Sequence, residues 1–139
     1  MVTTVLGSCV SVCLWDSKLK IGGINHYMLP LWNGEGLATP KYGNIAINKL
    51  YEKMLSFGCK HSSLKAKMFG GGEVLAVRNA VLNVGERNIL LAIDMLKSMK
   101  IQIISQDVGG RSGRKLLFNT HTGNVLLKKL SKQVDDIKP

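Results

Sequence analysis

Two short apolar runs near the start of the chain, separated by a polar corner, are typical of two β-strands. Residues 2–6 and 10–15 consist mainly of β-branched and other apolar side chains, and Gly7, Ser8 and Cys9 lie between them. Gly7 lets the backbone bend at this corner because it has no side chain to resist the turn. The pattern therefore predicts a strand, a tight corner that presents Cys9, and a second strand.

The second strand and a returning strand over residues 21–29 are expected to form an antiparallel hairpin around the polar turn 17–20. A two-residue loop would place Cys9 directly opposite His26. A four-residue loop would place Cys9 opposite Met28 and leave His26 as a diagonal neighbour on the same face. Only a slip of one residue would separate the thiol from the imidazole, so both registers predict that they meet.

The rest of the chain alternates between helical and extended patterns. Apolar residues recur at helical spacing over 42–57 and 84–99, and short apolar runs indicate strands at 64–69, 101–105, 115–119 and 124–130. We expect an α/β fold, a single-domain α/β sandwich in which a mixed, largely antiparallel sheet is packed by two helices. The domain is expected to span residues 1–130, followed by a polar C-terminal tail over 131–139.

Composition agrees with a small globular protein. The 139 residues are 45% hydrophobic and 20% charged, enough for one domain with its own core. No apolar run approaches the roughly 18 residues of a membrane span and no export signal is recognisable, so a cytoplasmic location is expected. The three cysteines lack framework spacing, which favours reduced thiols. No metal site is predicted, because Cys9 and Cys13 have no matching second ligand pair.

The charge balance is strongly basic, with 19 lysines and arginines against 9 acidic residues and a net charge of +10. Few aromatic residues and no recognisable motif argue against nucleic acid as the partner. An acidic protein partner would explain the excess, because opposite charges speed encounter. Simple solubility is the alternative explanation.

The Cys9 corner has the features that a nucleophile requires. The backbone amides of Ser8 and Cys9 could face a developing oxyanion, and His26 could accept the thiol proton. A hydroxyl could then hold the other ring nitrogen, and Thr3 and Thr4 are near enough in sequence to supply it. Successive residues alternate across a strand, so only one of the two threonines can point toward the site. The alternatives are a buried structural cysteine and two ordinary strand threonines.

Two blocks around these residues resemble a known signature. Residues 3–10, Thr-Thr-Val-Leu-Gly-Ser-Cys-Val, and residues 22–30, Gly-Gly-Ile-Asn-His-Tyr-Met-Leu-Pro, are similar to the signature of the CheD family of chemoreceptor glutamine deamidases. Three further blocks follow in the family's order at 69–72, 84–88 and 107–114, so the resemblance covers nearly the whole chain. Members usually carry a further strand-forming stretch ahead of this signature, whereas two residues precede it here.

The resemblance implies a catalytic set and a reaction. Cys9 would be the nucleophile, His26 the general base and Thr3 the third member, with Thr4 the less favoured choice. The implied reaction is the hydrolysis of specific glutamine side chains of methyl-accepting chemotaxis receptors to glutamate, through a cysteine thioester and without a cofactor. The implied partners are the cytoplasmic helices of the receptors and a CheC-type phosphatase, with membranes approached only through the receptors. A binding module that docks and regulates this phosphatase is the alternative.

Four further residues are expected to contribute to substrate binding. Gly70 and Gly71 follow a predicted strand, and we expect their loop to lie near the active site. Arg111 and Arg114 belong to a glycine-rich turn and are candidates to contact an acidic substrate. Two exposed arginines on a flexible loop would be an equally good explanation.

Overall fold

The structure, a computed structural model, describes residues 1–32, 34, 36–73 and 83–130, so the predicted tail over 131–139 lies outside the described residues. Within them the chain forms β-strands, two α-helices and a short 3-10 helix over His61–Ser63. The elements are, in chain order, β1 (Val2–Leu6), β2 (Val10–Asp16), β3 (Ile21–Ile24), α1 (Gly43–Ser56), β4 (Leu64–Gly70), α2 (Val84–Ser98), β5 (Gln102–Val108), β6 (Gly113–Phe118) and β7 (Val125–Leu130).

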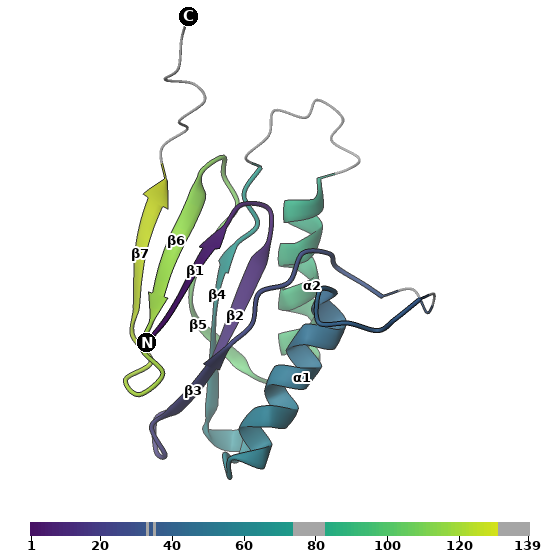
Figure 1. Ribbon diagram of the computed structural model, residues 1–139. Coiled ribbons are helices and arrows are strands. Elements are labelled where there is room, and N and C mark those ends of the chain that lie inside the picture. Colours follow the sequence, from purple (N-terminus) through teal and green to yellow (C-terminus); the bar gives the residue numbers. More distant parts are fainter. Residues whose placement is uncertain (33, 35, 74–82, 131–139) are drawn as a thin grey trace, which may run out of the picture.

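The strands form two sheets, and the helices cover one of them (Figure 1). The larger sheet has the order β3-β2-β4-β5, with β4 and β5 parallel and the other pairs antiparallel. The smaller sheet has the order β1-β6-β7 and is antiparallel throughout. The expected α/β sandwich with two helices is confirmed. The strands divide into two sheets because the Gly7 corner turns the chain away from β1, which pairs with β6 instead of β2.

Two clusters of buried side chains hold these three layers together. Val12, Leu14 and Ile47 belong to the cluster between the larger sheet and the helices. Cys13 and Phe69 belong to the cluster between the two sheets. Neighbouring residues of β2 thus enter different clusters, as the alternation of side chains along a strand requires. The central strand is therefore buried on both faces, and it fixes the position of the corner that precedes it.

Both helices lie where the apolar spacing predicts them. Asn83 caps α2, because its Oδ1 accepts a hydrogen bond from the Glu86 amide at 3.0 Å. α1 begins at Gly43, where a Cβ atom would collide with the side chains of Leu91 and Tyr27. No described helix has the length and apolar character needed to cross a bilayer.

Candidate active site

The hairpin register places Cys9 and His26 as diagonal neighbours. Asp16 pairs with Ile21, so the turn has four residues. Further along, Val10 and Tyr27 exchange backbone hydrogen bonds of 3.1 and 2.9 Å. This register puts Met28 opposite Cys9 and leaves His26 one diagonal step away on the same face, where Cα atoms are about 7–8 Å apart. The four-residue alternative is therefore the correct one.

An asparagine side chain interrupts the ladder beside His26. The Val12 amide donates to Asn25 Oδ1 at 2.8 Å, and the Asn25 amide donates to the Val12 carbonyl at 3.1 Å. The side-chain oxygen takes the place that the backbone carbonyl of residue 25 would fill in a regular ladder. β3 therefore ends at Ile24 instead of continuing to residue 29. His26 lies in the irregular segment that follows, and its side chain is exposed.

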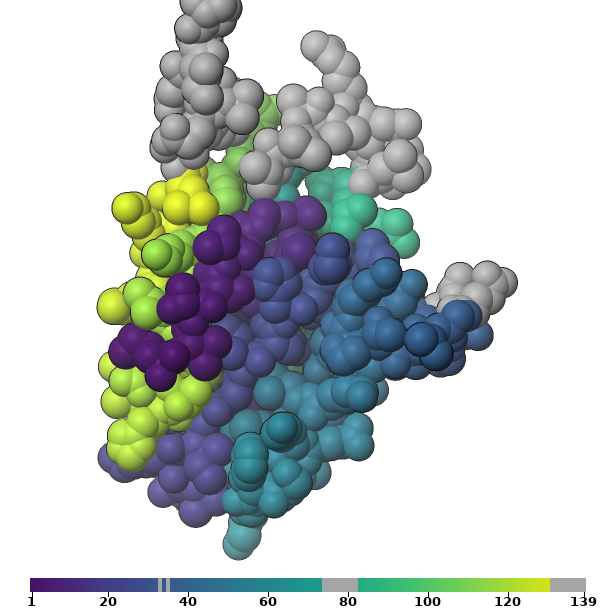
Figure 2. All heavy atoms as spheres, viewed as in Figure 1, coloured from purple at the N-terminus to yellow at the C-terminus, as the bar shows by residue number. Residues whose placement is uncertain are grey.

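The imidazole of His26 is held by Thr4. The Thr4 hydroxyl lies 2.9 Å from His26 Nδ1, across the gap between the two sheets. Thr4 lies on the same face of β1 as the buried Leu6. Thr3 lies on the opposite face with Val5, and Thr3 and Val5 are both exposed. Strand alternation thus turns Thr3, the residue that the resemblance implies, away from the imidazole. In Figure 2 the purple atoms of β1 adjoin the blue atoms of the segment after β3.

Burial sets the protonation of both reacting groups. It raises the pKa of the Cys9 thiol above the ordinary 9.0, although a hydrogen bond from the residue's own backbone opposes this effect. Partial shielding of the imidazole from water also lowers the pKa of His26 below the ordinary 6.5, although the residue as a whole is exposed. Near neutral pH the site therefore holds a thiol and an uncharged imidazole, with no hydrogen bond between them in the described part of the chain. If Nδ1 donates to the Thr4 hydroxyl, Nε2 carries the lone pair that can accept a proton.

Asn88 joins the two segments that carry this pair. Its buried Nδ2 donates to the carbonyl of Ser8 at 3.0 Å and to the carbonyl of Met28 at 3.0 Å. The Tyr27 hydroxyl in turn donates to the backbone carbonyl of Asn88 at 2.5 Å. One side chain of α2 therefore links the residue before Cys9 with the segment that follows His26.

Sequence reasoning did not single out Asn88, although a signal was present. It lies on the buried stripe of α2 with Gly85, Ala92 and Leu96. An amide on a core-facing stripe must find hydrogen-bond partners elsewhere in the fold, because an unpaired buried polar group is costly. The position of this amide on an apolar stripe therefore indicates a linking role.

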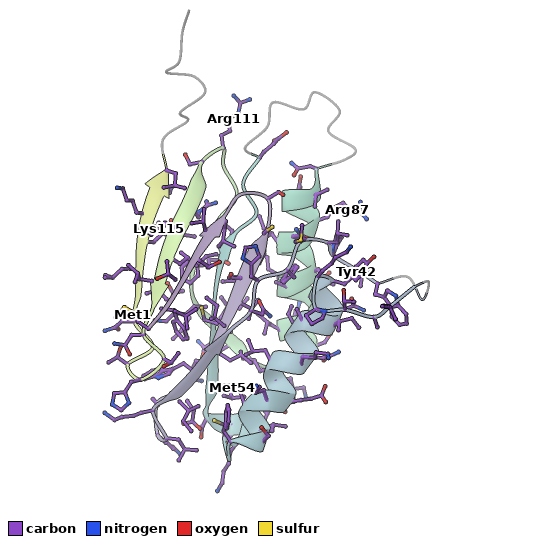
Figure 3. All side chains as sticks on the ribbon, in the orientation of Figure 1. Met1, Tyr42, Met54, Arg87, Arg111 and Lys115 are labelled. Carbon is purple, nitrogen blue, oxygen red and sulfur yellow. The ribbon has the colours of Figure 1, made fainter. Side chains whose placement is uncertain are left out.

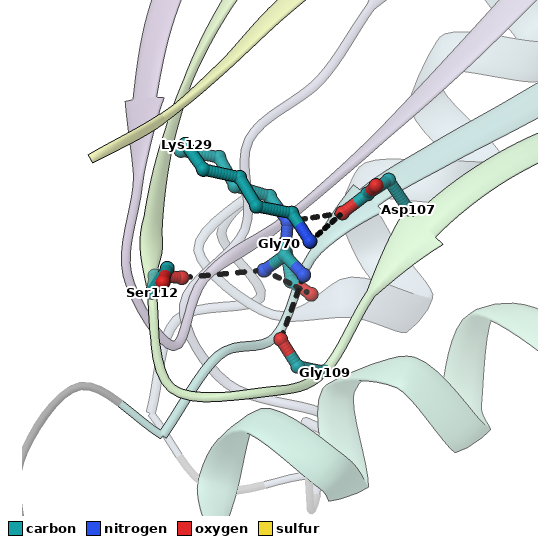
Figure 4. Close-up of polar contacts among 6 residues, drawn as sticks. Gly70, Asp107, Gly109, Ser112 and Lys129 are labelled. Carbon is teal, nitrogen blue, oxygen red and sulfur yellow. Dashed lines mark hydrogen bonds and ion pairs between the residues drawn. The ribbon is translucent and has the colours of Figure 1, made fainter. Parts of the chain in front are cut away.

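Arg114 is not available to a substrate, contrary to the expectation above. Its side chain is 2% exposed and donates to Asp107 at 2.7 Å (Figure 4). It also donates to the carbonyls of Gly109 at 2.7 Å, Gly70 at 3.3 Å and Ser112 at 3.5 Å. A buried arginine with these acceptors fixes the turn before β6 to the end of β4. The glycines and charged residues around it in the sequence gave no hint that its side chain would point inward.

Arg111 lies on the surface, as expected. Figure 3 shows its side chain at the end of the molecule, pointing away from the sheets. It borders a cavity of about 310 Å³ that is also lined by Gly71, Glu73 and Glu86. Whether this residue contacts a substrate stays a prediction.

Gly70 and Gly71 support the Cys9 corner from behind. The Gly71 amide donates to the Cys9 carbonyl at 2.8 Å, and the Gly72 amide donates to the Gly7 carbonyl at 2.9 Å. Gly70 has a φ of 107°, and a Cβ atom there would collide with the Cys9 carbonyl. Both glycines are buried. The expectation that this loop lies near the site is met, and its contacts are with the backbone of the corner.

Cys13 and Cys59 are buried apart from this arrangement. Burial raises the pKa of Cys13 to about 12, although Lys67 opposes the shift. Cys13 packs between the sheets with Leu6 and Phe69. Burial also raises the pKa of Cys59, and Asp16 adds to the effect. Cys9 is the half-buried thiol among the three.

Comparison with known proteins supplies a family and its named members. The family model described as CheD chemotactic sensory transduction matches residues 28–129. A protein of Trichlorobacter lovleyi named "Probable chemoreceptor glutamine deamidase CheD" is 56% identical over 126 residues, covering 91% of this chain and 78% of the relative. A protein of Sulfurimonas denitrificans with the same name is 50% identical over 134 residues, covering 95% of this chain and 85% of the relative.

Proposed function

Because the chain belongs to the CheD family, we propose that it is a deamidase that converts specific glutamine side chains of methyl-accepting chemotaxis receptors to glutamate. The proposal assigns Cys9 as the nucleophile and His26 as the general base. It places the reaction in the cytoplasm, on the cytoplasmic helices of the receptors. The names of the relatives support the substrate class, and the site geometry supports the assignment of residues.

The first half of the reaction forms a thioester. His26 Nε2 takes the proton of the Cys9 thiol as sulfur attacks the carbon of the glutamine side-chain amide. The carbonyl oxygen becomes an oxyanion, which the backbone amides of Ser8 and Cys9 stabilise. The protonated imidazole then gives its proton to the departing nitrogen, and ammonia leaves. The result is a thioester between Cys9 and the former glutamine.

The second half releases glutamate. Water takes the place that ammonia left, and His26 accepts one of its protons as the oxygen attacks the thioester carbon. A second oxyanion forms at the same amides and collapses, and the thiolate leaves and recovers its proton from the imidazolium. Thr4 keeps the ring oriented through both halves, because its hydroxyl binds Nδ1 and leaves Nε2 toward the reacting atoms.

The single observation that carries this proposal is the hydrogen bond between Thr4 and His26, combined with the register that puts Cys9 on the same face. A surface histidine of no function needs no partner on a strand from the other sheet. Here a hydroxyl binds the imidazole, and a half-buried thiol lies on the same face one diagonal step away. This arrangement supports the assignment of Cys9 as a nucleophile with His26 as its oriented base.

The test is incubation of the purified protein with a receptor cytoplasmic fragment, followed by peptide mapping by mass spectrometry. We expect specific glutamines to show the mass increase that accompanies replacement of an amide by a carboxylate. Cys9→Ala should abolish this conversion, and His26→Ala should slow it by about a hundredfold or more. Cys13→Ala, which removes a thiol outside the site, is the matched control and should retain conversion. Conversion by the Cys9→Ala protein would refute the assignment.

The alternative role is docking of a CheC-type phosphatase, which the resemblance implies. Cys9→Ala separates the two roles, because loss of a thiol should stop chemistry and leave a docking surface intact. We expect the variant to bind the phosphatase as the unaltered protein does. If the unaltered protein binds the phosphatase tightly and converts no receptor glutamine, docking is the function.

A further inference from the structure

A groove of about 300 Å³ opens beside the proposed general base. It is lined by Ile24, Asn25, His26, Pro40, Ala46, Lys49, Leu50 and Lys53, and we call it the His26 groove. One wall is the segment around the end of β3, and the other is α1, whose ends are near Tyr42 and Met54 in Figure 3. The groove therefore adjoins the imidazole to which a substrate amide would be brought.

The charges in the His26 groove are of one sign. Lys49 and Lys53 are both exposed and stand one helical turn apart on α1, which puts their Cβ atoms about 5–6 Å from each other. Neither lysine forms an ion pair within the described residues, where the ion pairs involve Asp107 with Arg114 and Lys129. Glu52 is on the same helix but does not line the groove. Both ammonium groups are therefore free to bind an incoming anion.

The cavity at Arg111 offers a contrast. Its lining contains the carboxylates of Glu73 and Glu86 together with Arg111, so the charges of opposite sign are mixed there. The His26 groove has cationic lysines and no carboxylate among its lining residues. An acidic chain would thus be favoured at His26 over the other cavity.

We propose that the His26 groove binds carboxylate side chains that flank the target glutamine, and that Lys49 and Lys53 determine this preference. The inference rests on the proposed deamidase function and adds a rule for substrate choice. Each glutamine that is converted becomes a glutamate, so one turnover creates a new anion beside any remaining glutamine. A receptor helix that already carries glutamates would therefore be the better substrate for the next conversion.

The test uses two synthetic helical peptides, each with one glutamine. In one peptide glutamates stand one helical turn before and after the glutamine, and in the other alanines replace them. We expect kcat/KM to be about tenfold higher for the glutamate peptide, because each flanking carboxylate gains an exposed ion pair with a lysine of the groove. The difference should lie in KM, because the lysines bind the flanks and not the reacting amide.

Lys49→Glu/Lys53→Glu should remove the preference, so that the glutamate peptide no longer has a higher kcat/KM than the alanine peptide. Lys115→Glu/Lys128→Glu is the matched control, because it changes the net charge equally at two exposed residues paired across β6 and β7, away from α1 (Figure 3). Lys49→Gln/Lys53→Gln repeats the test without introducing new negative charge. The inference would be overturned if the Lys115→Glu/Lys128→Glu control lost the preference for the glutamate peptide equally. It would also be overturned if both groove variants kept that preference unchanged.

Binding separates failure of the groove from failure of the chemistry. Fluorescence anisotropy with labelled peptides is measured on Cys9→Ala protein, with and without the Lys49→Glu/Lys53→Glu change. Preference for the glutamate peptide that depends on the two lysines supports the groove even if no peptide is converted, in which case the deamidase proposal alone fails. Equal binding of both peptides overturns the groove, whatever the activity.

Discussion

At the scale of single residues, substitution of Thr4 tests how the site is organised. Because this hydroxyl binds Nδ1, we expect Thr4→Ala to lower kcat by about ten- to a hundredfold while KM stays unchanged, since a misplaced base slows chemistry more than binding. Thr4→Ser should restore much of the rate. Thr3→Ala is the control on the outer strand face and should remain within about twofold of the unaltered protein. The reverse result would return the role to Thr3, as the resemblance implies.

The pH dependence of the reaction follows from the lowered pKa of His26. Only the uncharged imidazole can accept the thiol proton, so activity should be lost as pH falls through the pKa of His26. Burial lowers that pKa, and the acidic limb of kcat/KM should therefore lie below the ordinary 6.5. A profile measured from about pH 4 to pH 8 on a neutral peptide checks this expectation. A midpoint above pH 7 would contradict an uncharged resting imidazole.

Asn88 should act as a positioning residue. Asn88→Asp keeps the shape but removes the two amide donations to Ser8 and Met28, so we expect a loss of about 1–3 kcal/mol in unfolding free energy. We also expect kcat to fall and the acidic limb of the pH profile to move, because the Cys9 and His26 segments lose their common link. Asn83→Ala is the matched control, since loss of the α2 cap costs about 1 kcal/mol without touching either segment. Equal kinetic effects in both variants would reduce Asn88 to a purely structural role.

Several of these residues could be found from the sequence, and others could not. Strand periodicity predicted that Cys9 and His26 lie on one face of the hairpin with either turn length. To choose between Thr3 and Thr4, one must know which face of β1 turns toward β3. The orientation of β1 depends on its pairing with β6, which lies far along the chain. Arg114 looked like a surface arginine because sequence cannot show that Asp107 and three carbonyls surround it.

At the scale of elements, Arg114 fixes the turn between β5 and β6 to the end of β4. Arg114→Leu should lower the unfolding free energy by about 2–4 kcal/mol, because it removes donors from Asp107 and from carbonyls with little access to water. Arg111→Ala, which alters an exposed side chain of the same turn, should change it by no more than about 0.5 kcal/mol. Urea denaturation followed by circular dichroism measures both. Similar losses of unfolding free energy in the two variants would mean that the buried contacts of Arg114 contribute little to stability.

Element boundaries followed local pattern closely except where one side chain intervened. The helices agree within one residue at each end with the apolar spacing, because each packs one stripe against a sheet. The hairpin strand over residues 21–29 was predicted too long. Asn25 ended it by substituting a side-chain oxygen for a backbone carbonyl, a local competition that composition does not reveal.

The net charge of +10 acts at the scale of the whole molecule. If this charge steers an acidic receptor fragment, kcat/KM for the fragment should fall severalfold as NaCl rises from about 0.05 to 0.5 M, because screening shortens the reach of surface charges. A short uncharged glutamine peptide is the control and should be insensitive to salt. An equal fall for both substrates would show that salt affects the enzyme and not the encounter.

The layered architecture could be predicted in class but not in connectivity. Alternation of strand and helix patterns indicated an α/β sandwich in which two helices pack on a sheet. Periodicity could not predict the division of the strands into two sheets, because the apolar face of a strand does not determine which other strand it pairs with.

The pairing of β1 with β6 has a consequence for how the protein is made. β1 has no ladder partner among the described strands until residues 113–118 have also been synthesised. Until then no ladder partner holds β1 in the position from which the Thr4 hydroxyl reaches His26. Under the proposed assignment of the site, a nascent chain should lack catalytic activity until residues 113–118 have been synthesised and β1 can pair.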